Sequence, residues 1–187
     1  MSQRLNVTKT FKLFIGGEFP RSESGRSMEV LADDGSIYAH LCRASRKDLR
    51  EGVEAAARAQ RSWGSASAHL RGQVVYRMAE MLEGKAIECA RIIADTSEST
   101  LSQARKEVAA SIDRLVAFAG WSDKYQQTLG CQNPVAGAYY NFTVPEPMGI
   151  VGVVAPDTFP LLGLITLMAP PLAATPWPLV IPIAPPA

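Results

Sequence analysis

The chain has 187 residues, of which 20% are charged and 47% are hydrophobic, so it can bury a core and is not compositionally disordered. Its 19 basic and 18 acidic residues give a net charge of +1, which argues against a protein whose main work is binding nucleic acid. All basic residues lie at or before Lys124, and beyond it only Glu146 and Asp157 are charged. The C-terminal third is therefore expected to be largely buried.

The N-terminal segment indicates a small antiparallel sheet. Residues 11–19 (FKLFIGGEF) alternate weakly around Gly16-Gly17, a pattern typical of a hairpin with a tight turn. Residues 28–31 and 37–41 are two more short strand candidates, and the turn signal Asp33-Asp34-Gly35 separates them.

Four amphipathic helices are predicted next. Ser45 and Asp48 have the capping-box pattern before a helix that should end near residues 63–64, and Ser67 can cap a second helix. Spacings of three and four residues assign five large apolar residues to the buried face of the second helix: Leu70, Val74, Met78, Met81 and Leu82. Residues 86–94 and 101–121 form the other two helices. Together they predict a helical layer.

The pattern changes after Gly130. Residues 139–144 alternate as a strand does, and residues 149–154 (GIVGVV) are continuously apolar, like a strand buried in a parallel sheet. A turn at 156–160 and a helix at 161–172 complete one β–α step, and we expect no second strand after it. Prolines crowd the last residues, so we expect 175–187 to be a disordered tail.

The cysteines and histidines predict neither a metal site nor a disulfide framework. Cys42, Cys89 and Cys131 lie far apart in the chain, and no pair of Cys or His residues has zinc-ligand spacing. Cys89 falls inside a predicted helix, where a packed side chain is favoured over a nucleophile. The N-terminus lacks a secretory h-region, and the apolar run at 159–174 is too short to span a membrane. We expect a cytoplasmic protein.

Two segments carry a family resemblance: FAGWSDK at 118–124 and EPMGIVGVVAPDTFPLLGLITLMAPPLAA at 146–174. They resemble the N-terminal part of aldehyde dehydrogenases, in which an AGWADK-like segment ends a helix and E-P-x-G-V-x-G-x-I-x-P-W-N-F-P-L follows a crossing strand. KLFIGGEF also resembles the family's early strand, and LREGVEAAARAQRSW its first long helix. The similarity runs from about residue 11 to 174.

The resemblance implies an α/β fold over residues 1–174. It would contain N-terminal antiparallel strands, a helical layer, a crossing oligomerisation strand and the first β–α step of a Rossmann-like domain. Residues 138–146 correspond to the strand that pairs subunits, so the implied partner is a second copy or a full-length relative. A strand buried within the same chain is the alternative for this segment.

The resemblance also implies a reaction, the oxidation of an aldehyde to a carboxylic acid with NAD or NADP. In the family the catalytic cysteine and glutamate come well downstream of the segments matched here, and none of this chain's cysteines stands in that context. We therefore expect the chain to represent an N-terminal fragment of an oxidoreductase that is inactive alone. The alternatives are a catalytically inactive family member acting as a binding or scaffold subunit, and a truncated, non-functional product.

The family's P-W-N-F motif reads Pro156-Asp157-Thr158-Phe159 here. Thr158 takes the position of the asparagine that helps hold the oxyanion, and Asp157 replaces a large aromatic residue. The family's ribose-binding lysine aligns with Ile181. The backbone that lies against the cofactor in the family corresponds to Val154, Ala155 and Pro156, with Asp157 following. These departures predict weak or absent NAD(P) binding. The P-D-x-[FW]-P-L segment is similar to the divergent second copy in family sixteen of the aldehyde dehydrogenases.

Overall fold

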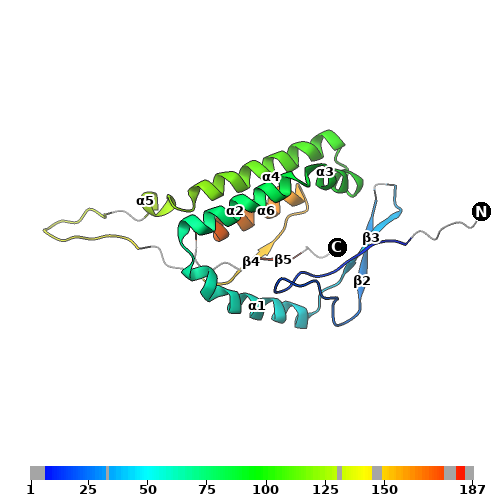
Figure 1. The fold of residues 1–187 in the computed structure, drawn as a ribbon, viewed down its shortest axis with the longest axis horizontal. Coiled ribbons are helices and arrows are strands. Elements are labelled where there is room, and N and C mark those ends of the chain that lie inside the picture. The colour runs from blue at the N-terminus through cyan, green and yellow to red at the C-terminus, as the bar shows by residue number, and fades with distance from the viewer. Residues whose placement is uncertain (1–6, 33, 130–131, 145–148, 175–179, 184–187) are drawn as a thin grey trace, which may run out of the picture.

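The computed structural model describes residues 7–32, 34–129, 132–144, 149–174 and 180–183 (Figure 1). Its elements are, in chain order, β1 (Thr10–Phe11), β2 (Ser27–Leu31), β3 (Ile37–Cys42), α1 (Arg46–Ser65), α2 (Ala68–Glu83), α3 (Ala86–Asp95), α4 (Leu101–Trp121), α5 (Tyr125–Leu129), β4 (Val151–Val154), α6 (Pro160–Ala174) and β5 (Val180–Ile183). The architecture is α/β, as expected.

The N-terminal sheet has the order β1-β3-β2 and is mixed, not wholly antiparallel. β2 and β3 pair antiparallel as expected, but β1 lies parallel to β3, with Thr10 opposite His40. The predicted tight turn is present, because Ile15 and Glu18 form an isolated bridge around Gly16 and Gly17 (φ 62° and 88°). The arms of this turn pair with each other instead of joining the sheet.

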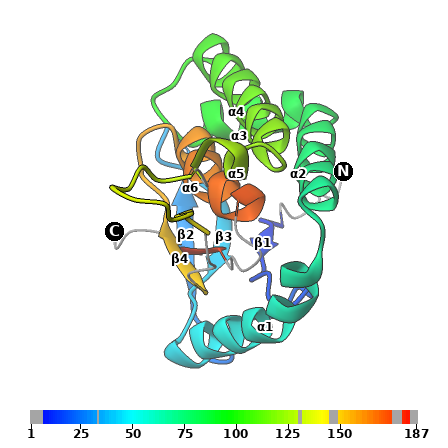
Figure 2. The same ribbon diagram turned by 90° about the vertical axis from the view of Figure 1, so that its left-hand side faces the viewer.

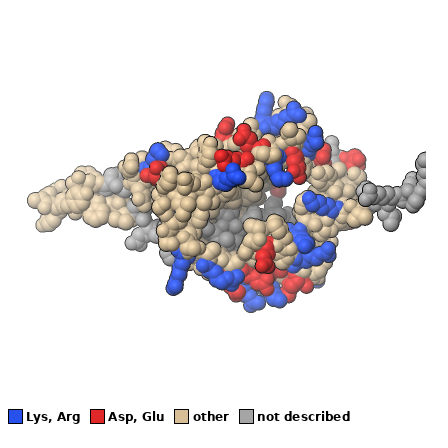
Figure 3. All heavy atoms as spheres, viewed as in Figure 1, with Lys and Arg blue, Asp and Glu red and all other residues tan. Residues whose placement is uncertain are grey.

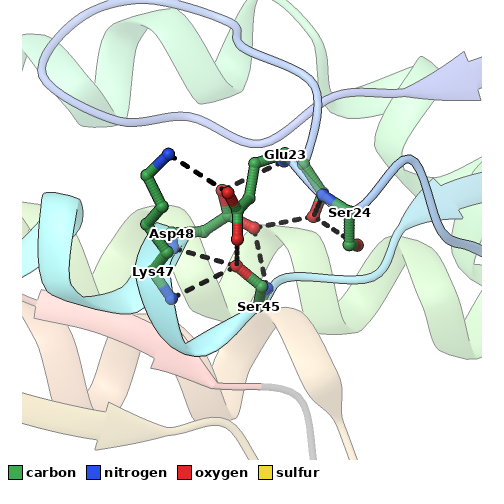
Figure 4. A network of polar contacts seen from close by, with 6 residues as sticks. Glu23, Ser24, Ser45, Lys47 and Asp48 are labelled. Atoms are coloured by element: carbon green, nitrogen blue, oxygen red, sulfur yellow. Dashed lines mark hydrogen bonds and ion pairs between the residues drawn. The ribbon is translucent and has the colours of Figure 1, made fainter.

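The predicted capping box begins α1. The Ser45 hydroxyl accepts a hydrogen bond from the Asp48 amide, and the Asp48 carboxylate accepts one from the Ser45 amide at 2.7 Å (Figure 4). The Ser22 hydroxyl also donates to this carboxylate at 2.7 Å, and Asp48 is buried. Burial raises the pKa of Asp48, but these hydrogen bonds outweigh it and hold the pKa below its ordinary value. Asp48 thus ties the loop before β2 to the start of α1.

The main core lies between α2, α4 and α6. Its buried members come from all three helices: Val75, Ala79, Leu115, Ile165 and Ala169. A second cluster joins α3 to α4. Figures 1 and 2 show α1 on the other side of the strands from these helices. The expected helical layer is therefore made of α2, α3, α4 and α6, and α1 is not part of it.

The predicted buried face of α2 was right only in part. Met78 and Leu82 pack against the main core, but Leu70, Val74 and Met81 are exposed. The smaller Gly72, Val75 and Ala79 are buried instead. A Cβ atom on residue 72 would lie 2.9 Å from the Ala119 carbonyl oxygen, so α2 approaches α4 closely through its small residues. Periodicity identified an apolar stripe on this helix but could not show that the neighbouring helix packs on the adjacent stripe.

A second parallel strand follows α6, which the proline content had led us not to expect. β5 pairs with β4 in register from Val151 opposite Val180 to Val154 opposite Ile183. Pro182 is tolerated because, within the described residues, β5 has a partner on one side and proline fits an edge strand. The rest of the expected tail, residues 175–179 and 184–187, lies outside the described residues. β4, α6 and β5 thus form a complete βαβ unit.

Residues 138–144 of the segment expected to be a crossing strand belong to an extended arm, defined here as residues 132–144, and residues 145–146 of that segment lie outside the described residues. The arm folds back on itself through one bridge between Gln132 and Phe142, and the Asn133 amide donates to the Asn141 carbonyl at 2.6 Å. Figure 1 shows the arm extending away from the helices. Because no strand lies beside it among the described residues, the arm pairs through this single bridge and not through an extended ladder of hydrogen bonds.

Candidate functional site

The five residues predicted for the site lie together in one exposed turn. This β4–α6 turn, residues 154–159, connects the carboxyl end of β4 to the N-terminus of α6. Ala155 is half-buried, and the other residues of the turn are exposed, from Val154 at 56% through Asp157 and Thr158 to Phe159 at 56%. In open α/β sheets ligands bind outside the carboxyl ends of the strands, so the turn is in the place where a ligand is expected.

Pro156 anchors the turn on the first turn of α6. A Cβ atom on residue 163 would overlap the Pro156 ring, lying 2.8 Å from its Cδ, so only glycine fits at Gly163. The Gly163 amide donates a hydrogen bond to the Phe159 carbonyl at 2.7 Å. The contact fixes the direction in which the chain leaves β4 and enters the helix.

Phe159 has a strained backbone. Its φ is 51°, and it is the one non-glycine residue with a positive φ within the described part of the chain. Such a conformation costs on the order of 1–3 kcal/mol and persists where surrounding contacts enforce it, most often at functional sites. Phe159 directly follows Thr158, so the strain falls beside the residue at the proposed oxyanion position.

Glu107 is a site residue that sequence reasoning missed. Its carboxylate, carried by α4, accepts hydrogen bonds from the amides of Leu161 (2.9 Å) and Leu162 (3.2 Å). Only 5% of Glu107 is exposed. The signal was available in the sequence, because Glu107 follows Ala104 by three residues and precedes Ser111 by four, and all three lie on the buried side of α4. A charged residue on a buried stripe requires a partner, and here the partner is the start of α6.

The cysteines and the other candidate groups lie outside this turn. Cys42 and Cys89 are half-buried free thiols, and burial, with a smaller effect of Glu88, raises the pKa of Cys89, as suits a packed side chain. Cys131 lies outside the described residues. Among the described residues no cluster of three His, Cys, Asp or Glu side chains could hold a metal ion. None of the helices in the described ranges is long and apolar enough to cross a membrane.

Comparison with known proteins identifies the same family as the sequence motifs. The family model described as "Aldehyde dehydrogenase family" matches residues 19–176. The chain is similar to the mouse (Mus musculus) cytosolic 10-formyltetrahydrofolate dehydrogenase, with 34% identity over 180 residues that cover 92% of this chain and 20% of that protein. The human mitochondrial 10-formyltetrahydrofolate dehydrogenase is 33% identical over 173 residues, which cover 90% of this chain and 19% of that protein.

Solved structures agree in fold. A variant of the aldehyde dehydrogenase from Bacillus cereus superposes with a TM-score of 0.84 and 28% identity, covering 92% of this chain and 35% of that chain. PnpE in complex with nicotinamide adenine dinucleotide gives a TM-score of 0.82 and 26% identity, covering 91% and 34%. The chain thus spans about a fifth of these curated relatives and about a third of these solved chains. It belongs to the aldehyde dehydrogenase family and matches the N-terminal part of that fold.

Proposed function

We propose that this chain supplies the N-terminal part of an NAD(P)-dependent aldehyde dehydrogenase unit, in which the β4–α6 turn faces the cofactor. The observation that carries the proposal is the exposure of this turn at the carboxyl end of β4, with the parallel strand β5 beside it. The similarity to PnpE, whose structure contains nicotinamide adenine dinucleotide, supports the same assignment. A bound nicotinamide would supply the hydride acceptor for aldehyde oxidation.

The turn fits the uncharged part of such a cofactor better than its phosphates. Exposed Val154 and Phe159 offer apolar surface on which a flat ring can lie. The first amides of α6 are already bonded to Glu107, and exposed Asp157 adds a negative charge. Asp157 would weaken the binding of a nearby phosphate by about 1 kcal/mol at a separation of ~4 Å in water-like surroundings.

Thr158 would act on the oxyanion that forms when the aldehyde carbonyl is attacked. Its hydroxyl can donate one hydrogen bond, but from a shorter side chain than the asparagine of the family motif. Loss of one well-placed donor typically costs on the order of 100-fold in rate. We therefore expect any reaction that depends on this position to be slow.

A second candidate function is that of a binding or scaffold subunit without catalytic activity. Asp157 and Thr158 both favour it, since they stand in the exposed turn where the family motif has an aromatic residue and an asparagine. For either function we propose that the arm pairs with a second copy or with a full-length relative. Its residues carry no charge, as its uniform tan colour in Figure 3 shows, and Tyr139, Tyr140 and Phe142 are 78%, 73% and 56% exposed.

Calorimetric titration of the purified chain with NAD and with NADP tests the proposal. We expect a Kd weaker than about 100 μM, equivalent to roughly −5.5 kcal/mol. The Asp157→Asn variant should bind about fivefold more tightly, because the repulsion of about 1 kcal/mol is removed. Asp95→Asn, which removes an exposed acid on α3, is the matched control and should leave the Kd unchanged.

Two results would count against the proposal. An equal effect of the two substitutions would show that Asp157 does not face the cofactor, and the absence of binding in all variants would remove the cofactor from the account. Assays with a panel of aldehydes, with the chain alone and mixed with a full-length relative, then separate the two functions. Turnover that requires Thr158 favours the enzyme, whereas unchanged turnover of the relative together with stable association favours the scaffold subunit.

A further inference from the structure

Every amide in the first turn of α6 has a partner. Pro160 has no N–H, the amides of Leu161 and Leu162 donate to one oxygen of Glu107, and the Gly163 amide donates to the Phe159 carbonyl. Helix N-termini normally present these amides to solvent, to a capping side chain or to a bound anion. Here a carboxylate from another helix takes that place.

Glu107 connects two helices, α4 and α6, that lie far apart in the chain. It lies 54 residues before Leu161 in the chain, on α4, and it is buried at the junction of α4 and α6. A buried carboxylate is costly unless it is hydrogen-bonded, and two amides at the positive end of a helix dipole provide that compensation. The bonds therefore hold the start of α6 against α4.

We infer that Glu107 is a positioning residue of the candidate site: its carboxylate fills the anion position at the N-terminus of α6, holds Thr158 in place through the β4–α6 turn, and closes this helix end to phosphates. The part that concerns a cofactor's phosphates rests on the function proposed above. The strain at Phe159 supports the inference. Glu107 restrains the chain just after this residue, and Pro156, held by its contact with Gly163, restrains the chain just before it.

Nuclear magnetic resonance of the full chain, labelled with ¹⁵N-leucine and ¹⁵N-threonine, follows the two bonded amides and the amide of Thr158. In Glu107→Gln the neutral oxygen can still accept both bonds, so the helix start and Thr158 stay in place while the Leu161 and Leu162 amide protons shift upfield. In Glu107→Ala both bonds are lost, and the Tm falls by about 3–10 °C. Glu98→Gln, at an exposed glutamate before α4, is the matched control and should move neither signal.

Inorganic pyrophosphate, added at constant ionic strength, tests whether the helix end is closed. We expect it to leave the Leu161 and Leu162 signals of the wild-type chain unchanged and to shift them saturably in Glu107→Ala, where the amides are open to an anion. Saturable shifts in the wild-type chain would overturn the inference. It would also be overturned if pyrophosphate left the Leu161 and Leu162 signals of Glu107→Ala unchanged. Both readouts are free of NAD, so a failure of cofactor binding would remove the proposed function and leave the role of Glu107 to be judged separately.

Discussion

Gly163 in the first turn of α6 packs against the ring of Pro156, which lies near the start of the β4–α6 turn. Because a Cβ atom at residue 163 would overlap that ring, Gly163→Ala should force the helix away from the turn. Overpacking of this kind typically costs about 1–3 kcal/mol, which outweighs the gain of about 1 kcal/mol in helix propensity from glycine to alanine. Urea unfolding followed by circular dichroism measures the change in the free energy of unfolding.

The matched control is Gly120→Ala in α4, where a Cβ atom meets nothing within 4 Å. This variant should be neutral or up to about 1 kcal/mol more stable, because only helix propensity changes. Equal stabilisation of both variants would mean that the Pro156–Gly163 contact does not constrain the turn.

The buried carboxylate of Asp48 predicts a pH dependence of stability. Its pKa in the folded chain is held below the ordinary value, so it stabilises the fold fully above the unfolded pKa of about 3.9, and this contribution is lost as the pH falls through the lower folded pKa. Asp48→Asn should therefore cost about 1–3 kcal/mol at pH 7 and progressively less below pH 4.

Urea titrations of the wild-type chain, of Asp48→Asn and of Asp113→Asn at pH 7, 5 and 3 measure this difference. Asp113 is exposed on α4, so its substitution is the control and should change the free energy of unfolding little at any of these values. If the cost of Asp48→Asn is the same at pH 3 as at pH 7, the carboxylate charge does not stabilise α1.

The arm predicts association through its aromatic side chains. The ring centroids of Tyr140 and Phe142 lie 5.3 Å apart. The two side chains therefore share one face, as the alternation of residues 139–144 indicated. Phe142→Lys should abolish the dimer or mixed oligomer, because a charge would be buried between the paired arms. Light scattering during size-exclusion chromatography measures the mass of each species.

Phe14→Lys is the control for that experiment, since Phe14 is 68% exposed but belongs to the N-terminal hairpin turn. It should leave the oligomer intact. A monomer in the wild-type chain, alone and mixed with a full-length relative, would end the idea that the arm pairs subunits.

Local signals predicted several elements closely. The capping box of Ser45 and Asp48 located the start of α1, Ser67 located the start of α2, and the long apolar stripe after residue 100 gave the bounds of α4. These features depend on residues near one another in the chain, so their physical causes are visible in the sequence. The turn that joins β4 to α6 was recognised for the same reason.

The missed features depend on contacts between distant segments. The packing of neighbouring segments decides three of these features: the parallel pairing of β1 with β3, the full extent of the buried face of α2, and the bonds from Glu107 to α6. β5 was missed because Pro182 and the prolines that flank the strand in the sequence, read locally, argue against a strand, whereas an edge position beside β4 tolerates Pro182. Glu107 was the most informative omission, since its partners lie 54 and 55 residues away.

A residue-by-residue map of NAD binding shows most directly whether the β4–α6 turn, and not the start of α6, faces the cofactor. The backbone amide signals of the ¹⁵N-labelled chain are followed while NAD is added to millimolar concentration. We expect saturable shifts concentrated at Val154, Ala155, Asp157 and Thr158, with the Leu161 and Leu162 amides unmoved because Glu107 holds them. Shifts centred on Leu161 and Leu162, or shifts confined to residues outside the turn, would contradict this expectation.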